Sequence, residues 1–125
     1  MIFLDTNFLV FALSPGTAED QRLRVLFVAK ESVGVSSIVW AEFLCGPVTP
    51  EDIRLASALF PAPEPFTAED AVRAAELFNG TGRRRTSLAD CMVAAISLRT
   101  NASLATNNSA DFQRFVPWGL SLLAP

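Results

Sequence analysis

Short apolar runs alternate with longer stretches of helical spacing along the chain. Residues 1–4 and 102–105 are apolar runs that stop on polar residues, and residues 32–35 form a third short run. Runs of this length are typical of buried strands. Residues 64–66 predict a brief extended piece, and residues 120–123 predict a last strand at an edge of the sheet.

Helix-start signals lie between these predicted strands. The tetrapeptide Thr-x-Glu-Asp begins at Thr17, Thr49 and Thr67. A threonine cap followed by acidic residues stabilises a helix start, because both interact with the free N–H groups of the first turn. These signals predict helices that end near residues 31, 60 and 78. Further helices are predicted over residues 8–13, from residue 36 or 37 to 45, and from residue 88 to about 100.

Strands that alternate with helices predict an α/β fold with a mainly parallel central sheet flanked by helices. We expect one domain over residues 1–125, because no segment has the composition of a linker. The longest apolar runs are far shorter than the ~18–20 residues that cross a bilayer. The N-terminus lacks the basic segment of a signal peptide, and the chain has two cysteines. A reduced, cytoplasmic protein with no membrane partner is therefore expected.

The composition excludes many kinds of catalytic site. The chain has no histidine and no tyrosine, which rules out Ser-His-Asp triads, Cys-His dyads and zinc sites that need histidine. Catalysis would have to use carboxylates, arginines, Lys30, hydroxyls, thiols, or a metal held by oxygen atoms. The net charge is −3, so no global positive field attracts nucleic acid. The one basic cluster is Arg83, Arg84 and Arg85.

Several acidic and amide side chains lie at the ends of predicted strands or on the helices that follow them. Asp5 comes directly after the first strand, and Glu42 and Asp90 lie on helices rich in apolar residues. Ligands of open parallel sheets bind outside the carboxyl ends of the strands. We therefore expect these side chains to meet at one rim of the sheet. The full set is Asp5, Glu42, Asp90, Asn107, Asn108 and Asp111.

Carboxylates gathered at one rim need a cation. Two carboxylates ~4 Å apart repel by roughly 4 kcal/mol at an effective dielectric constant of ~20. Either their pKa values rise or a cation sits among them. Oxygen ligands suit Mg²⁺ or Mn²⁺ better than zinc. Such an ion activates water and neutralises charge on a phosphodiester, so the pattern favours hydrolysis of a phosphate ester.

Each acid also has a purely structural interpretation. Asp90 stands three residues after Ser87, which is the spacing of a capping box. Asp5 and Asp111 could cap neighbouring helical segments, and Glu42 could form an ion pair. The arginine run could be a solvated loop. These separate explanations do not account for why the acids gather at strand ends together.

Four segments stand out once the acids are taken with their neighbours. They are Ile2-Phe-Leu-Asp-Thr-Asn7, Ala41-Glu-Phe43, Leu88-Ala-Asp-Cys-Met-Val-Ala-Ala95 and Leu104-Ala-Thr-Asn-Asn-Ser-Ala-Asp-Phe112. In this order and at this spacing they resemble PIN-domain ribonucleases, and most closely the VapC-type toxins of bacterial toxin–antitoxin pairs. The resemblance covers nearly the whole chain. It implies a PIN-like three-layer sandwich and a Mg²⁺- or Mn²⁺-dependent endoribonuclease.

The resemblance implies a role for each matching acid. The first three acids of the family fall on Asp5, Glu42 and Asp90, which are expected to hold the metal and to position the attacking water. The fourth position is occupied by Asn108, which departs from the family pattern. Asp111 is the candidate that replaces the missing acid in catalysis.

The resemblance also implies supporting residues and partners. Asn7 and Thr106 are expected to hydrogen-bond the acids or water, with Asn108 as a further supporting group. The Arg83–Arg85 run would contact the RNA backbone beside the site. A small antitoxin protein would lie along a hydrophobic groove, to which some of the many phenylalanines could contribute. Self-association into a homodimer is a further expectation.

Two other functions stay open at this point. A catalytically weak or inactive PIN-fold binding module would account for Asn108, because an incomplete acid set holds metal poorly. A receiver-like phosphoacceptor also has acids at its strand ends. It fits less well, because such domains carry a lysine late in the chain and here the only lysine is Lys30, in an early predicted helix.

Overall fold

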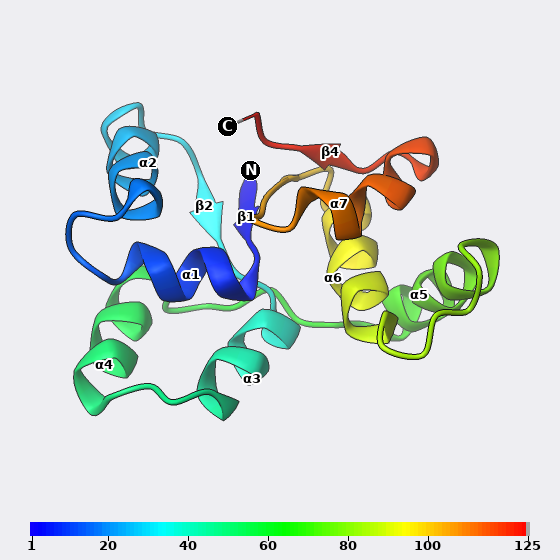
Figure 1. Cartoon of the computed structure of the whole chain (residues 1–125), viewed down its shortest axis with the longest axis horizontal. Helices are drawn as coiled ribbons and strands as arrows, with labels where there is room; N and C mark the ends of the chain where they lie inside the picture. Colours follow the sequence, from blue (N-terminus) through cyan, green and yellow to red (C-terminus); the bar gives the residue numbers. More distant parts are fainter. Residues whose placement is uncertain (125) are drawn as a thin grey trace.

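The computed structural model describes residues 1–124, which form an α/β fold (Figure 1). Four strands, seven α-helices and one 3₁₀ helix, η1, are found within these residues. In chain order they are β1 (Ile2–Leu4), α1 (Thr6–Ala12), α2 (Ala18–Val28), β2 (Val33–Gly34), α3 (Ser37–Cys45), α4 (Pro50–Leu59), α5 (Ala68–Gly80), α6 (Leu88–Arg99), β3 (Ser103–Ala105), α7 (Ser109–Phe112), η1 (Gln113–Trp118) and β4 (Ser121–Leu122).

The described strands form one parallel sheet in the order β2-β1-β3-β4. In its centre, Ile2 of β1 lies opposite Ser103 of β3, and Leu4 lies opposite Ala105. The chain leaves β1 on one side to form β2 and returns on the other side to form β3. The topological switch point, where parallel sheets bind ligands, therefore lies between β1 and β3. The predicted parallel sheet and its last edge strand are confirmed.

The predicted helix starts are confirmed at their caps. The hydroxyls of Thr17, Thr49 and Thr67 each accept a hydrogen bond from the backbone N–H three residues later. At Thr49 and Thr67 the acid at that position bonds back to the threonine N–H, which completes a capping box. Ser36 caps α3 by accepting from the N–H of Val39. Short-range hydrogen bonding therefore sets where these helices begin.

Helices flank the sheet. In Figure 1, α2 and α4 lie towards the left of the molecule and α5 towards the right, while α1 and α6 lie below the strands. The apolar helix α6 is buried from Val93 to Ser97 and packs against α3 and α5. Five fully buried phenylalanines, among them Phe8 and Phe43, fill the core. No helix in residues 1–124 has the length and apolar character needed to cross a membrane.

Candidate active site

Asp5 occupies the switch point between β1 and β3. Its backbone N–H donates to the carbonyl of Ala105 at 2.9 Å. Its Oδ1 accepts from the N–H of Thr6 at 2.8 Å, and its Oδ2 accepts from the hydroxyl of Thr106 at 3.0 Å. Burial raises the pKa of Asp5, against the two hydrogen bonds that lower it, and the charge of Asp111 raises it further. The carboxylate is thus oriented by hydrogen bonds, and no basic side chain of residues 1–124 forms an ion pair with it.

Glu42 is joined to Asp5 through a single residue. The hydroxyl of Thr6 donates to Glu42 Oε1 at 2.9 Å, while the N–H of Thr6 binds Asp5. Glu42 is exposed on α3, although its neighbours Val39 and Phe43 are buried. Within residues 1–124 its hydrogen-bond partner is a hydroxyl and not a basic group. The ion-pair interpretation of Glu42 is therefore not supported.

Asp90 lies in the first turn of α6, and the charges of the other acids affect its pKa. Burial and the charges of Asp5, Asp111 and Glu42 raise its pKa to about 6. The guanidinium of Arg114 acts in the opposite direction. A carboxyl that is affected by three other carboxylates shares one electrostatic environment with them. The structure thus brings the four predicted acids to the same end of the sheet.

The structural interpretations of these acids have different outcomes. The Ser87 side chain makes no capping bond to the backbone of α6 and donates instead to the carbonyl of Arg84 at 2.8 Å. The capping-box explanation of Asp90 is therefore wrong. Asp111 lies inside the first turn of α7, so it does not cap the segment that follows. Asp5 does occupy the N-cap of α1, as its structural interpretation predicted.

The sequence analysis missed Arg114. Its Nη2 lies 3.6 Å from Asp90 Oδ2, and its guanidinium lies over the ring of Phe115, 4.7 Å from the centroid. Its spacing from Asp111 is the sequence feature that could have identified it. Arg114 follows Asp111 by three residues in a helical segment, so both side chains project from the same face.

The predicted supporting residues occupy different positions. Thr106 donates to Asp5, and its hydroxyl accepts from the backbone N–H of Asn108 at 3.0 Å. Asn108 stands at the N-cap of α7, exposed and without a side-chain cap bond. Asn7 is exposed on α1 and lines a hollow of about 320 Å³ together with Thr6 and Glu42. Thr106 is thus tied to Asp5, while the two asparagines border the acids.

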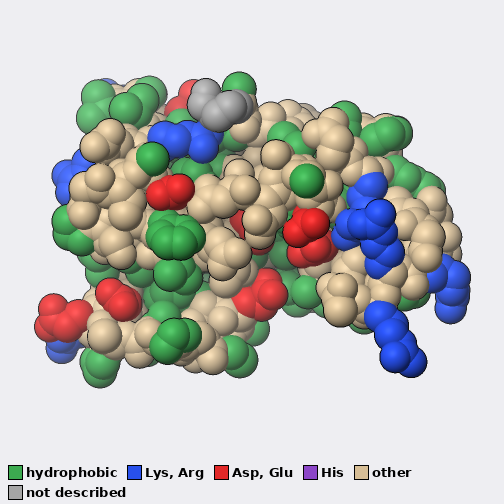
Figure 2. All heavy atoms as spheres, viewed as in Figure 1, with side chains coloured by type: hydrophobic (Ala, Val, Ile, Leu, Met, Phe, Trp, Pro, Cys, Tyr) green, Lys and Arg blue, Asp and Glu red, His purple; other side chains and the backbone are tan. Residues whose placement is uncertain are grey.

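The predicted arginine run lies in the loop between α5 and α6, directly before the helix that carries Asp90. All three arginines are exposed. Arg83 binds the side chain of Asn79 and lies over the ring of Phe78, 5.6 Å from its centroid. Figure 2 shows acidic side chains near the middle of this face and basic side chains to their right. A polyanion lying across this face would meet both groups.

The acids fit a hydrated cation better than a closed protein cage. In the described part of the chain, no group of three or more His, Cys, Asp or Glu side chains is arranged to hold a metal ion. The donors that do converge are all carboxylate oxygens. Mg²⁺ keeps several waters and binds through one or two carboxylates, so it does not need a dedicated cage. The donor set therefore suits Mg²⁺ or Mn²⁺.

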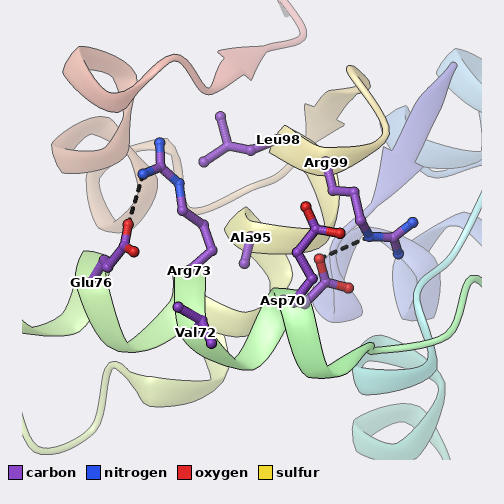
Figure 3. A pocket seen from close by; sticks show the side chains of 8 residues that line it. Asp70, Val72, Arg73, Glu76, Ala95, Leu98 and Arg99 are labelled. Carbon is purple, nitrogen blue, oxygen red and sulfur yellow. Dashed lines mark hydrogen bonds and ion pairs between the residues drawn. The ribbon is translucent and has the colours of Figure 1, made fainter.

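A second acidic region lies between α5 and α6, where Figure 3 shows the side chains around a hollow of about 590 Å³. Asp70 is only 1% exposed, and its Oδ1 accepts from Arg99 Nε at 2.8 Å. Burial alone would raise the pKa of Asp70, but hydrogen bonds from Arg99 and Thr67 outweigh it and hold the pKa below its ordinary value. This acid is fully paired within the fold.

Several solved structures are similar to the chain. A VapBC2 structure from Rickettsia felis, bound to a promoter DNA fragment, has a TM-score of 0.76 at 24% identity over 98% of both chains. A toxin–antitoxin complex from Klebsiella pneumoniae has a TM-score of 0.71 at 22% identity over 90% of both chains. VapC20 of Mycobacterium tuberculosis, a toxin that cleaves the sarcin–ricin loop, has a TM-score of 0.69 at 20% identity over 100% of both chains. These likenesses confirm the fold.

No curated protein matches the chain in sequence. The family model of the PIN domain, however, matches residues 2–116, which include the strands β1, β2 and β3. Its span runs from the first strand to η1, so it contains Asp5, Glu42, Asp90 and Asp111. The chain belongs to the PIN-domain family.

Proposed function

We propose that this chain is a Mg²⁺- or Mn²⁺-dependent endoribonuclease that hydrolyses RNA phosphodiester bonds, and that it is the toxin of a toxin–antitoxin pair. One observation carries the proposal. The carboxylates of Asp5 and Glu42 are oriented side by side at the end of the sheet, because Thr6 donates to both of them and Thr106 donates to Asp5. Carboxylates that repel one another at the switch point of a parallel sheet are stabilised by a cation.

Three acids would hold the ion directly or through its bound water, namely Asp5, Glu42 and Asp90. The ion supplies Lewis acidity, which activates water and neutralises charge on the phosphodiester. Thr6 and Thr106 hold both oxygens of Asp5 in place. Thr6 also fixes Oε1 of Glu42, so Oε2 of Glu42 would complete the shell of the ion or orient the attacking water.

Asp111 takes the fourth acidic position in this proposal. Its charge raises the pKa of both Asp5 and Asp90, so it acts on the same site. Asn108 brings no charge, and its backbone N–H supports Thr106. Asn7 stands beside Glu42 on the rim of the neighbouring hollow, where it would hydrogen-bond water.

RNA is the substrate that best fits the surroundings of the acids. A chain of net charge −3 needs local cations to approach a polyanion, and the exposed Arg83–Arg85 loop supplies them next to α6. The similar VapC20 toxin cleaves an RNA loop. PIN-family membership and this likeness together favour RNA cleavage.

A matched pair of glutamates tests the proposal. Glu42 and Glu76 both lie exposed on helices, and each accepts a hydrogen bond from another side chain. We expect the wild-type chain to cleave RNA with Mg²⁺ or Mn²⁺ and to stop in EDTA. Glu42→Gln should lose at least about tenfold in rate, since even supporting groups of metal sites are worth 10- to 100-fold. Glu76→Gln should cleave like the wild type, and equal activity of both variants would contradict the assignment.

The alternative function is a catalytically weak or inactive PIN-fold binding module. Asn108 at the fourth position and the lack of a preformed three-ligand group in residues 1–124 favour it. Calorimetric titration with Mn²⁺ separates the two functions. Binding that disappears in Asp90→Ala supports the enzyme, whereas no binding at millimolar Mn²⁺ supports the module.

The antitoxin would bind along α1, α2 and α4. Phe11 and Phe27 are about half and two-fifths exposed there, and Val10 and Leu55 are exposed as well. Two hollows meet at Leu13, one of which reaches Glu42 and the other Phe27 and Leu55. A peptide in this groove would reach the acids directly. The similar Klebsiella pneumoniae structure is a toxin–antitoxin complex.

Co-expression with the product of the neighbouring reading frame tests the partner. We expect a stable complex with the wild-type chain and loss of that complex with Phe27→Glu. Val72→Glu, on the exposed face of α5, is the matched control and should leave the complex intact. Equal recovery of both variants would place the partner elsewhere. The expected homodimer stays a prediction, which sedimentation equilibrium of the free chain tests.

A further inference from the structure

We infer that Arg114 is a positioning residue for Asp90, and that its guanidinium fork holds the Asp90 carboxylate in the orientation that binds the divalent cation. The inference rests on the proposed function, because it concerns the same acidic site. It assigns a role to a residue that neither the sequence motifs nor the family match distinguishes.

The Arg114 side chain is mostly buried beside the acids. Only 15% of it is exposed, and its Nε is buried without a hydrogen-bond partner in the described chain. A buried donor without a partner is unfavourable, so such atoms in folded proteins call for an explanation. The guanidinium lies over the ring of Phe115, 4.7 Å from its centroid. Arg114 thus packs against Phe115 and has one donor without a partner.

The geometry identifies the missing acceptor. Arg114 Nη2 lies 3.6 Å from Asp90 Oδ2, which is longer than the ~2.7–3.2 Å of a hydrogen bond. Nε and Nη2 are adjacent donors of one planar fork, which binds carboxylates through two parallel N–H···O bonds. A small movement of Asp90 towards the fork would pair both donors. Each carboxylate oxygen would keep a lone pair for the cation.

The burial of Arg114 argues against direct contact with RNA. Its Nε has almost no contact with solvent, whereas the three arginines of the Arg83–Arg85 loop are exposed. Among the ion pairs of residues 1–124, the pair with Asp90 is the one that joins a basic side chain to an acid of the site. Arg114 is thus placed to act on Asp90 and not on the substrate.

Arg114→Lys is the direct test, because it keeps the charge and removes the fork. Arg22→Lys is its matched control. Arg22 also lies over a phenylalanine ring, at 5.3 Å from the centroid of Phe8, but donates to the carbonyl of Ala124. The Mn²⁺ dissociation constant is measured by electron paramagnetic resonance without RNA. We expect it to rise about tenfold in Arg114→Lys and to stay unchanged in Arg22→Lys.

Arg114→Gln separates positioning from simple charge and serves if the lysine variant is unstable. Removing a positive charge beside a divalent cation would tighten Mn²⁺ binding if Arg114 acted by charge alone, whereas positioning predicts weaker binding. The melting temperature of each metal-free variant shows whether the fold is kept. In RNA cleavage we expect kcat to fall with KM unchanged.

Several outcomes would overturn the inference. Wild-type Mn²⁺ affinity in Arg114→Lys, or tighter binding in Arg114→Gln, removes the positioning role. A raised KM with unchanged Mn²⁺ affinity would show that Arg114 contacts RNA instead. These results leave the proposed function standing. If the wild-type chain itself binds no Mn²⁺ at millimolar concentration, the proposed function fails and the inference fails with it.

Discussion

Asp5 and Asp70 are two buried aspartates in opposite electrostatic situations. They are 8% and 1% exposed, and both stand at the start of a helix. Arg99 donates to Asp70 and helps to hold its pKa below the ordinary value. Within residues 1–124 the carboxylate of Asp5 accepts from a backbone N–H and the Thr106 hydroxyl, and burial raises its pKa. The α5–α6 region is balanced within the fold, and the end of the sheet is not.

This difference separates a structural acid from a functional one. A fold tolerates a buried carboxylate that pairs with a basic side chain, because each group then has a hydrogen-bond partner of opposite charge. A cluster of acids without enough cations is unfavourable for folding and persists where a ligand completes it. Asp70 and Arg99 form the first kind, which Figure 3 shows. Asp5 with its neighbouring acids forms the second.

The largest expected effects come from replacing each aspartate by asparagine. Asp5→Asn removes a proposed metal ligand, so we expect Mn²⁺-dependent RNA cleavage to fall more than about 100-fold, beyond the range for supporting groups. Asp70→Asn replaces one of two accepting oxygens by an NH₂ group, so either Arg99 or the N–H of Thr67 loses its acceptor, and the free energy of unfolding should fall by about 1–3 kcal/mol. Cleavage rates and urea unfolding of both variants provide the measurement.

The two variants should lose different properties: Asp5→Asn should lose activity, and Asp70→Asn should lose stability. Asp5→Asn should keep a free energy of unfolding at or above that of the wild type, because it removes a repelled charge. Asp70→Asn should cleave RNA within about twofold of the wild type when it is folded. Full cleavage by Asp5→Asn, or an equal loss of activity in both variants, would remove the distinction between the regions.

Mn²⁺ should stabilise the folded chain through Asp5 and not through Asp70. Mn²⁺ at 100 times its dissociation constant should raise the free energy of unfolding by about 2.7 kcal/mol, because it binds only the folded chain. Asp70→Asn should gain the same increment, since Asp70 is paired with Arg99 outside the metal site. Asp5→Asn should gain much less. Equal stabilisation of all three proteins would mean that Mn²⁺ binds elsewhere.

The two regions should also respond to pH in different ranges. The pKa of Asp90 is raised to about 6 from 3.8, so between about pH 4 and 6 the unfolded chain releases this proton before the folded chain does. Stability should therefore fall as the pH rises through this range. The full change corresponds to about 3 kcal/mol, and the 32% exposure of Asp90 reduces it to about 1–2 kcal/mol.

Asp90→Asn is the control for this pH dependence. It should flatten the fall between pH 4 and 6, apart from the part that Asp5 contributes with the same sign. The pKa of Asp70 is lowered in the folded chain. Ionised Asp70 therefore stabilises the fold at a pH above the ordinary aspartate pKa, and this stabilisation is lost only as the pH falls below about 4. Urea unfolding of metal-free protein across the range measures both. An unchanged profile in Asp90→Asn would show that Asp90 is not the group responsible.

Local chemistry made much of the fold predictable from sequence. Thr17, Thr49 and Thr67 start helices through hydrogen bonds that span three residues, and a pattern of that length is visible in a sequence. The two central strands, β1 and β3, were predictable because most of their residues are buried. The α/β order then fixed which strand ends carry acids. Asp5 at the switch point follows from topology alone.

The fine structure of the site was not predictable in the same way. The bond from Thr6 to Glu42 joins residues 36 positions apart, and the pair of Asp90 with Arg114 joins α6 to η1. No local pattern encodes such distances, since they depend on how the helices pack. The capping-box spacing of Ser87 and Asp90 misled because the serine bonds to Arg84 instead. Charge balance, which identifies the site, appears only once the chain has folded.

The smallest expected effect concerns the arginine loop beside the unbalanced acids. Arg84 and Arg85 are exposed, whereas Arg83 is engaged by Asn79 and Phe78. The double variant Arg84→Gln with Arg85→Gln should weaken RNA binding by roughly 3- to 10-fold. If both contact phosphates, the salt dependence of log K should fall by about 1.4, since each contact with a single strand contributes about 0.7.

Fluorescence anisotropy in the Asp5→Asn background measures this binding without cutting the RNA. The matched control changes Arg24 and Arg54 to glutamine, which alters the net charge equally at exposed arginines of α2 and α4. That control should keep the wild-type salt dependence, because those helices lie on the other side of the sheet in Figure 1. An equal loss in both double variants would mean that RNA responds to overall charge. Arg84 and Arg85 would then not form a specific RNA contact beside the acidic end of the sheet.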